Sequence, residues 1–113
     1  MIKLIVADMD GTLLNDNNEI NEEFWEVHKK LKEKGVIFAV GSGRQYHNLK
    51  ERFSSIKDDM LFIAENGTYV VYHDEELYVN VIEKKDIEKI LKISRNIDNC
   101  KVVLCGKNSA YTE

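Results

Sequence analysis

The chain has 113 residues, of which 43% are hydrophobic and 32% are charged, and its formal net charge is −4 at pH 7. This composition is typical of a folded, water-soluble domain and excludes a disordered or fibrous chain. Its apolar runs are strand-sized, and none reaches the roughly 20 residues that a membrane-spanning helix requires. The mildly acidic balance lacks the basic footprint of a nucleic-acid-binding protein. We therefore expect a cytoplasmic protein that binds neither nucleic acid nor membranes.

The N-terminal segment predicts a buried strand followed by a loop and a helix. Residues 2–7 form an apolar, β-prone run, and the run Asn15–Asn18 is a dense turn signal. Asn21 is a typical helix cap, so we expect a helix from this residue to about Lys34.

The spacing of apolar residues predicts which face of this helix is buried. Phe24, Val27 and Leu31 recur at the interval of a single helix face. His28 lies among charged residues, and we expect it to face solvent. Gly35 supplies the stop that ends the helix.

Two further strands complete an alternating pattern. Val36–Val40 and Leu61–Ala64 are apolar and strand-sized, and Gly41–Arg44 is expected to open a helix between them. The order β–α–β–α–β with short connections predicts a Rossmann-like α/β core with a parallel sheet. In such sheets ligands lie beyond the carboxyl ends of the strands.

The pattern changes after Gly67. Residues 68–72 and 77–81 flank a polar segment and predict an antiparallel hairpin. A helix over residues 84–97 and a strand over residues 101–105 are expected next, as the opening of another α+β unit.

The strongest chemical signal follows the first strand. Asp8 and Asp10 are separated by one residue, so that two carboxylates can leave the strand end together. Such a pair suits a hard divalent cation such as Mg²⁺, which relieves the repulsion between them. A carboxylate can attack a phosphate monoester while a second one acts as acid and base. Gly11 permits a close backbone turn and Thr12 adds a hydroxyl and an amide, and both are expected to bind the phosphate. The alternative is a solvated pair that merely ends the strand.

The second strand end predicts an anion site. Ser42 offers a hydroxyl and Gly43 an amide at the expected start of a helix, where anions bind favourably. Arg44 either reaches a substrate phosphate or pairs with a neighbouring acid. Asn66 is either a contact to the substrate or its surroundings, or a simple turn residue.

The motifs resemble those of the haloacid dehalogenase superfamily, whose members are mostly phosphatases. Asp8–Leu14 matches its first motif and Ser42 fits its second, while Asn66-Gly67 before a hairpin resembles the Cof-type hydrolases. The resemblance implies that Asp8 is the nucleophile of an aspartyl-phosphate reaction and that Asp10 is the acid/base. It also implies that Mg²⁺ binds the Asp8 carboxylate and the Asp10 carbonyl. The substrate is expected to be a small, sugar-phosphate-like monoester.

The resemblance covers only the first half of the family pattern. Residues 1–82 match the first half of the core, and residues 83–113 resemble the beginning of an α/β cap. A lysine motif and an acidic motif follow the cap in the family. We therefore expect a truncated chain with weak Mg²⁺ binding, slow or absent turnover, and an exposed sheet edge that favours self-association.

Two other functions remain open at this stage. The chain can be a non-catalytic remnant of the fold that binds phosphate or a partner protein. A receiver-type signalling domain has a similar length and sheet, but its phosphate-accepting aspartate lies at the third strand end, where this chain has Glu65–Gly67.

Overall fold

The computed structural model describes residues 1–112, which form two compact units that meet between Val79 and Asn80. The predicted boundary between core and cap, after residue 82, lies a few residues further along the chain.

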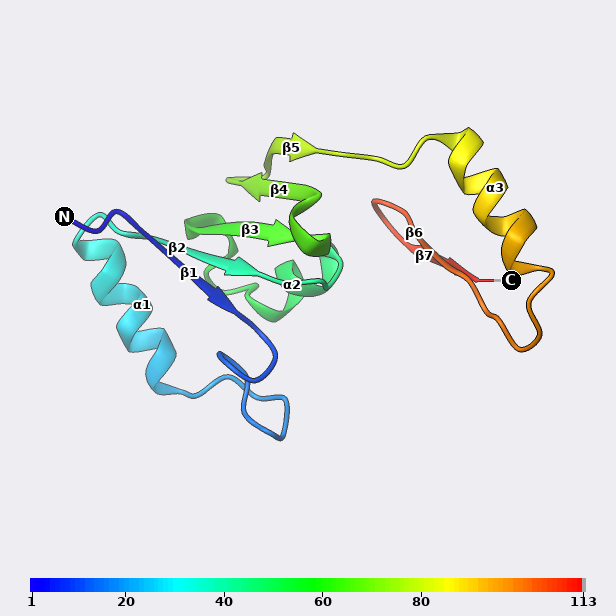
Figure 1. The fold of residues 1–113 in the computed structure, drawn as a ribbon. Coiled ribbons are helices and arrows are strands. Elements are labelled where there is room, and N and C mark those ends of the chain that lie inside the picture. The colour runs from blue at the N-terminus through cyan, green and yellow to red at the C-terminus, as the bar shows by residue number, and fades with distance from the viewer. Residues whose placement is uncertain (113) are drawn as a thin grey trace. The chain divides into compact units, whose positions relative to one another are not determined.

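The first unit is built on a five-stranded sheet whose strand order is β1-β2-β3-β4-β5 (Figure 1). The strands are β1 (Leu4–Asp8), β2 (Ile37–Gly41), β3 (Met60–Ala64), β4 (Tyr69–Tyr72) and β5 (Glu75–Val79). β1, β2 and β3 are parallel, whereas β4 and β5 pair antiparallel to their neighbours. The predicted α/β core, with a parallel sheet and an added hairpin, is confirmed.

Two helices connect the parallel strands. They are α1 (Glu23–Glu33) and α2 (Tyr46–Arg52), and two short 3₁₀ turns follow, η1 (Lys57–Asp59) and η2 (Glu65–Gly67). β1, β2 and β3 follow one another across the sheet in one direction. Because connections between parallel strands are right-handed, α1 and α2 lie on the same face of the sheet. The buried core agrees, because alternate residues of the strands meet residues of α2 and α1. Its buried members include Phe38, Val40, Met60, Phe62, Val71, Leu49 and Phe53, with Phe24 and Leu31 of α1 packed against them.

The opposite face of β1 is open, which corrects the expectation of a buried first strand. Leu4 and Val6 are 46% and 51% exposed, whereas Ile5 and Ala7 pack against the core. β1 is also the first strand of the sheet and pairs only with β2 in the described part of the chain. The strand is therefore buried on one side alone.

The helix starts differ from the sequence prediction in one case. Asn21 caps α1 as predicted, because its Oδ1 accepts a hydrogen bond from the Glu23 amide at 2.8 Å. The second helix begins at Tyr46, so that Gly41–Arg44 forms a loop before the helix instead of its first turn. The amide of Gly43 therefore does not lie at a helix N-terminus.

His28 belongs to the core, so the prediction that it faces solvent is wrong. Its side chain is 4% exposed, and its ring lies 6.0 Å from that of Phe24 and 6.2 Å from that of Phe38 between centroids. Val27, predicted to be buried, is 50% exposed. The face that packs on the sheet runs through Phe24, His28 and Leu31, because helical residues four and three apart share a face.

The hairpin of β4 and β5 turns tightly at two residues with left-handed backbone. His73 and Asp74 have φ of 52° and 59°, as a type I′ hairpin turn requires. The Asp74 carboxylate accepts a hydrogen bond from the Tyr46 hydroxyl at 3.0 Å and pairs with Lys50. Burial, together with the hydrogen bond to Asp74 and the charge of that carboxylate, raises the pKa of Tyr46 to about 12. The hairpin is thereby fastened to α2.

The second unit contains a helix and a small two-stranded sheet. These are α3 (Lys84–Ser94), β6 (Val103–Cys105) and β7 (Ala110–Thr112), with β6 and β7 antiparallel. The helix ends before the predicted residue 97. Several of the unit's large apolar side chains are exposed, namely Ile90, Ile93, Ile97, Val103 and Tyr111.

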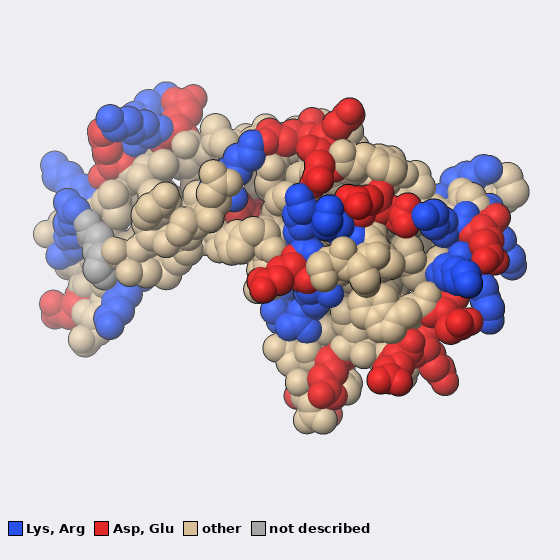
Figure 2. Space-filling model, turned by 180° about the vertical axis from the view of Figure 1, so that it is seen from behind, with Lys and Arg blue, Asp and Glu red and all other residues tan. Residues whose placement is uncertain are grey.

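Charged side chains of both signs are interspersed on the face of the molecule seen in Figure 2. This pattern agrees with the mild net charge of the sequence. No helix within residues 1–112 combines the length and the apolar character that crossing a bilayer requires.

The buried position of His28 predicts a pH-dependent stability. Burial lowers the pKa of His28 below its usual value, although Asp59 opposes this shift. The unfolded chain therefore binds more protons than the folded one below about pH 6.5, and stability falls as the pH is lowered through that range. Urea unfolding of the wild type between pH 5 and pH 8 is expected to show this loss, and His28→Leu is expected to flatten it.

His47 supplies the matched control, because its side chain is exposed on α2. His47→Leu is expected to keep the pH dependence of the wild type. An unchanged slope in His28→Leu would contradict the assignment of the effect to His28.

Candidate active site

The parallel register brings three loops to the same end of the sheet. Asp8 pairs with Gly41, and Gly41 pairs with Ile63, so the carboxyl ends of β1, β2 and β3 lie side by side. The segments that follow these strands contain the polar residues that the sequence singles out. The Ser42 amide also donates to the carbonyl of Ile63 at 3.0 Å, which joins the second and third strand ends beyond the ladder.

Met9 anchors the turn that carries the two aspartates. Its side chain is fully buried, and its carbonyl accepts hydrogen bonds from the amides that follow. These donors are Thr12 at 3.3 Å, Leu13 at 3.0 Å and Leu14 at 2.9 Å. Because the residue between Asp8 and Asp10 points into the core, both aspartates remain exposed.

The turn orients the first aspartate and leaves room beside the second. Asp8 Oδ1 accepts a hydrogen bond from the Met9 amide at 2.7 Å. Gly11 has φ of 74°, and no atom lies within 4 Å of the position that a Cβ would take. This left-handed residue and the open space around it let a ligand approach the backbone closely.

Arg44 donates two hydrogen bonds to the Asp10 carboxylate. Its Nη2 lies 2.7 Å from Oδ1, and its Nε lies 3.3 Å from Oδ2. The side chain of Arg44 is 26% exposed, whereas that of Asp10 is 64% exposed. The hydrogen bonds from Arg44 lower the pKa of Asp10, and the same pairing raises the pKa of Arg44. Arg44 thus pairs with a neighbouring acid, as one of its two readings predicts.

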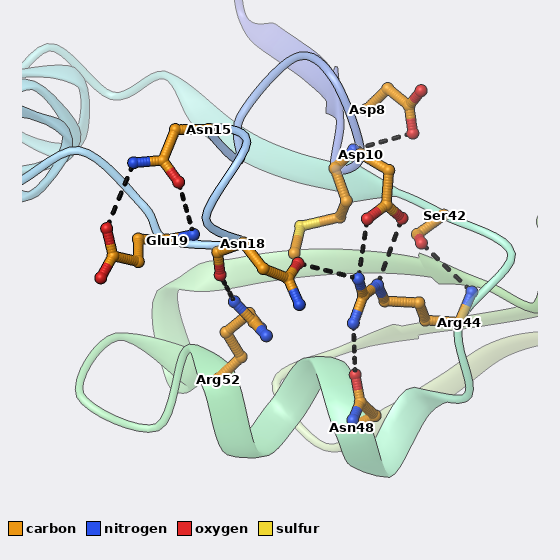
Figure 3. A network of polar contacts seen from close by, with 10 residues as sticks. Asp8, Asp10, Asn15, Asn18, Glu19, Ser42, Arg44, Asn48 and Arg52 are labelled. Carbon is orange, nitrogen blue, oxygen red and sulfur yellow. Dashed lines mark hydrogen bonds and ion pairs between the residues drawn. The ribbon is translucent and has the colours of Figure 1, made fainter.

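Two asparagines and a second arginine extend this contact into a network (Figure 3). The amide oxygens of Asn18 and Asn48 accept hydrogen bonds from Arg44 at 3.2 and 3.5 Å. Arg52 donates to the Asn18 main-chain carbonyl at 2.7 Å. The loop after the first motif is thereby tied to α2.

The loops after β2 and β3 are held together by backbone hydrogen bonds. The amide of Asn66 donates to the carbonyl of Ser42, and the amide of Glu65 donates to the carbonyl of Arg44, each at 3.1 Å. The Ser42 hydroxyl oxygen accepts a hydrogen bond from the Arg44 amide at 3.1 Å. Ser42 is half-buried and lies between the two other loops.

The third loop has a strained backbone. Glu65 and Asn66 have φ of 51° and 57°, and Gly67 has φ of 88°. Left-handed conformation is uncommon for a glutamate, and such residues cluster at functional sites. Gly43 lies against this loop, because a Cβ at that position would meet Asn66 Oδ1 at 2.9 Å.

The chemistry of the exposed oxygen atoms fits Mg²⁺ at the end of β1. Asp8 offers an exposed carboxylate of the type that this hard cation prefers, and the open space at Gly11 adjoins the main-chain carbonyl of Asp10. Among residues 1–112, no cluster of three or more acidic, histidine or cysteine side chains joins them. The described residues would therefore supply only part of a magnesium shell.

All of the predicted site residues lie at this end of the sheet. Asp8 is the last residue of β1, Asp10, Gly11 and Thr12 form the turn after it, and Ser42, Gly43, Arg44 and Asn66 lie in the loops after β2 and β3. The Thr12 amide donates to Met9 and stabilises that turn.

Three further residues were missed by the sequence interpretation. Met9 carries a usable signal, because an apolar residue between two acids indicates that the acids point away from the core. Asn18 carries none, because its contact to Arg44 joins segments 26 residues apart, and Asn48, four residues after Arg44, has no feature that marks it as a partner.

The chain resembles phosphatases of known sequence. It is 37% identical over 112 residues to 5-amino-6-(5-phospho-D-ribitylamino)uracil phosphatase YbjI of Escherichia coli, covering 98% of this chain and 41% of that protein. It is 34% identical over 84 residues to the Bacillus subtilis phosphatase YcsE, which carries the same enzyme name, covering 74% of this chain and 32% of that protein. The chain thus spans less than half the length of these relatives.

The fold resembles that of solved structures over nearly its whole length. The structure of SMU.1108c from Streptococcus mutans matches 99% of this chain and 43% of its own, with a TM-score of 0.90 and 28% identity. Residues 5–113 match the family described as haloacid dehalogenase-like hydrolase. The chain therefore belongs to the haloacid dehalogenase-like hydrolase family.

Proposed function

We propose that the chain supplies the nucleophile and the phosphate-binding loop of a Mg²⁺-dependent phosphatase. The observation that carries this proposal is the register of β1 and β2, which sets Asp8 beside the start of the Ser42 loop. We propose further that unit 1 belongs to the catalytic core and that unit 2 begins a cap.

The proposed reaction has two steps. An Asp8 carboxylate oxygen attacks phosphorus, the bond from phosphorus to the ester oxygen breaks, and Asp10 gives a proton to the leaving oxygen. Water then attacks the aspartyl-phosphate, loses a proton to Asp10, and releases inorganic phosphate and free Asp8. Both aspartates are exposed on the turn that Met9 anchors, so a substrate can reach them.

The metal and Ser42 offset the charge of this reaction. Asp8 and Asp10 would hold Mg²⁺, which neutralises charge when an anion attacks an anion. The Ser42 hydroxyl and the amide of Gly43 would hold the phosphoryl oxygens. Ser42 suits this role because its position is set by backbone contacts to the third loop.

The substrate class follows from the relatives. Two of them are named for a phosphate ester of a ribityl chain, a polyol related to a sugar. We propose a small sugar-phosphate-like or polyol phosphate monoester as the substrate. A cytoplasmic location, which the sequence predicts, stays a prediction.

The first test is phosphate release from an aryl phosphate with and without Mg²⁺. Asp8→Asn is expected to reduce turnover at least about 10³-fold, because the substitution removes the attacking oxygen anion. Asp16→Asn is the matched control, since Asp16 is an exposed aspartate of the loop that follows the same turn. It is expected to keep wild-type turnover.

A folded chain that releases no phosphate above the Asp8→Asn background would contradict catalysis by these residues alone. Retained phosphate binding would then favour the alternative of a non-catalytic phosphate-binding remnant. The incomplete magnesium shell of the described residues is the observation that favours this alternative.

The contact between Gly43 and Asn66 generates a second test. Gly43→Ala is expected to weaken phosphate binding, because the new Cβ displaces the Asn66 amide that would lie 2.9 Å away. Asn66→Gly removes that amide and accepts φ of 57° without the roughly 1–2 kcal/mol that left-handed backbone costs most residues. The double variant Gly43→Ala/Asn66→Gly is therefore expected to recover the backbone geometry.

Phosphate titration of the three variants separates the two roles of Asn66. If Asn66 contacts the substrate, Asn66→Gly alone loses affinity and the double variant does not recover it. If Asn66 is only a turn residue, Asn66→Gly binds as the wild type does. Equal affinity in Gly43→Ala and the wild type would contradict the proposed phosphate loop.

We propose also that two copies of the chain associate through β1. Its outer edge is unpaired within the described residues, and Leu4 and Val6 make it partly apolar. Lys3 and Asp8 lie at opposite ends of the strand, so antiparallel pairing sets Lys3 of one copy beside Asp8 of the other. Open edges with this character favour strand pairing.

The association is tested by light scattering over a range of concentrations. The wild type is expected to show a dimer that Val6→Lys abolishes, because a charge on the edge opposes pairing. Val27→Lys is the matched control, since Val27 of α1 is exposed to the same degree, 50% against 51% for Val6. A monomer at all concentrations, or equal loss in both variants, would contradict the proposal.

A further inference from the structure

Among residues 1–112, the Arg44 side chain has one charged partner and two neutral ones. Asp10 takes two of its hydrogen bonds, while Asn18 and Asn48 accept the others through amide oxygens. The neutral partners come from separate elements, since Asn18 lies in the loop before α1 and Asn48 lies on α2. The guanidinium is therefore supported by contacts that do not depend on Asp10.

The loop that carries Asn18 is itself held in place by hydrogen bonds. Asn15 closes the loop, because its Oδ1 accepts hydrogen bonds from the amides of Asn17 and Glu19 at 3.0 and 2.9 Å. Arg52 holds the Asn18 carbonyl from α2. Asn18 can thus keep Arg44 in place if the contact to Asp10 is given up.

The two hydrogen bonds from Arg44 to Asp10 conflict with the acid/base role proposed for Asp10. An acid/base must direct a carboxylate oxygen at the reacting oxygen atom. Here both oxygens of Asp10 face the guanidinium, at 2.7 and 3.3 Å. At least one hydrogen bond between Asp10 and Arg44 must therefore break before Asp10 can exchange a proton with a leaving group or a water.

We propose that Arg44 exchanges the Asp10 carboxylate for a phosphoryl oxygen of the substrate, so that the bound ester frees the acid/base that acts on it. The inference rests on the proposed function. A guanidinium fork matches phosphate as well as carboxylate, and a phosphate monoester carries more charge with which to compete. Arg44 is also placed to meet such an anion, because its own amide is bonded to the hydroxyl oxygen of Ser42, the proposed phosphate ligand.

The exchange makes Asp10 and phosphate competitors for one arginine. Inorganic phosphate is the probe, titrated without metal into the whole chain. Asp10→Asn is expected to tighten phosphate binding by about tenfold, and Arg44→Met to weaken it by a similar factor, as befits hydrogen bonds to charged groups. Arg44→Lys keeps the charge without the fork and is expected to fall between the wild type and Arg44→Met.

The deciding quantity is the gain in phosphate affinity that Asp10→Asn causes, measured once with Arg44 present and once in the Arg44→Met variant. Exchange predicts a larger gain when Arg44 is present, because only then does Asp10 occupy the arginine that phosphate needs. If Asp10 merely repelled the anion, removing Arg44 would leave that repulsion unscreened, and the gain would be as large or larger. Lys34→Met, which removes an exposed cation that follows α1 and lies at the other end of β2 from Ser42, is the matched control and is expected to leave the gain unchanged.

Nuclear magnetic resonance reports the exchange directly. Phosphate is expected to shift the Arg44 Nε and Asp10 Cγ signals together, with one binding curve for both. A gain from Asp10→Asn that is undiminished in Arg44→Met would overturn the proposal.

Two other outcomes separate this inference from the proposed function. Phosphate binding that is lost in Ser42→Ala but unaffected by Arg44→Met would overturn the exchange and leave the phosphate loop standing. No phosphate binding in any variant, Asp10→Asn included, would overturn the exchange and also contradict the phosphate-binding step of the proposed function.

Discussion

The parallel pairing of β1, β2 and β3 is the constraint on which the site depends. In a parallel sheet all strands end on the same side, so the three segments that follow Asp8, Gly41 and Ala64 must share one space. Nothing in the local chemistry of Asp8 or Ser42 would otherwise bring them together. The hydrogen bonds between the loops, and the ion pair from Arg44 to Asp10, act on groups that the sheet has already gathered.

The sequence predicted the parts of the fold that follow from local patterns. The strand runs, the Asn21 cap and the hairpin all have periodic or turn signals, and each appears in the structure. The burial of His28 and the exposure of Val27 were not predictable in the same way, because the helix face is chosen by the aromatic rings of the sheet and core. The open outer face of β1 depends likewise on what packs there, which no pattern within the strand records.

The residues of the candidate site likewise divide into those that a local sequence pattern predicts and those that no local pattern predicts. Asp8, Asp10 and Ser42 are predicted from motif and position, because a strand end with these residue types has recognisable chemistry, and their roles stay a prediction. Which of its two partners Arg44 would contact was left open by the sequence. Arg44 is also held by Asn48, four residues further along the chain, and by the loop residue Asn18, whose distance of 26 residues hides its proximity. Long-range polar contacts of this kind leave no mark in the composition or the spacing of a segment.

The strand order has a consequence for how the first unit folds. Each strand from β1 to β5 lies next to its neighbour in the sequence, so the sheet grows in one direction without any strand inserted between earlier ones. In such a topology no strand has to wait for a later segment of the chain before it can pair with the strand that precedes it. Because chains are synthesised from the N-terminus, each strand can join the sheet as it leaves the ribosome. The loops that carry Asp8 and Ser42 would then meet as soon as β2 has paired with β1.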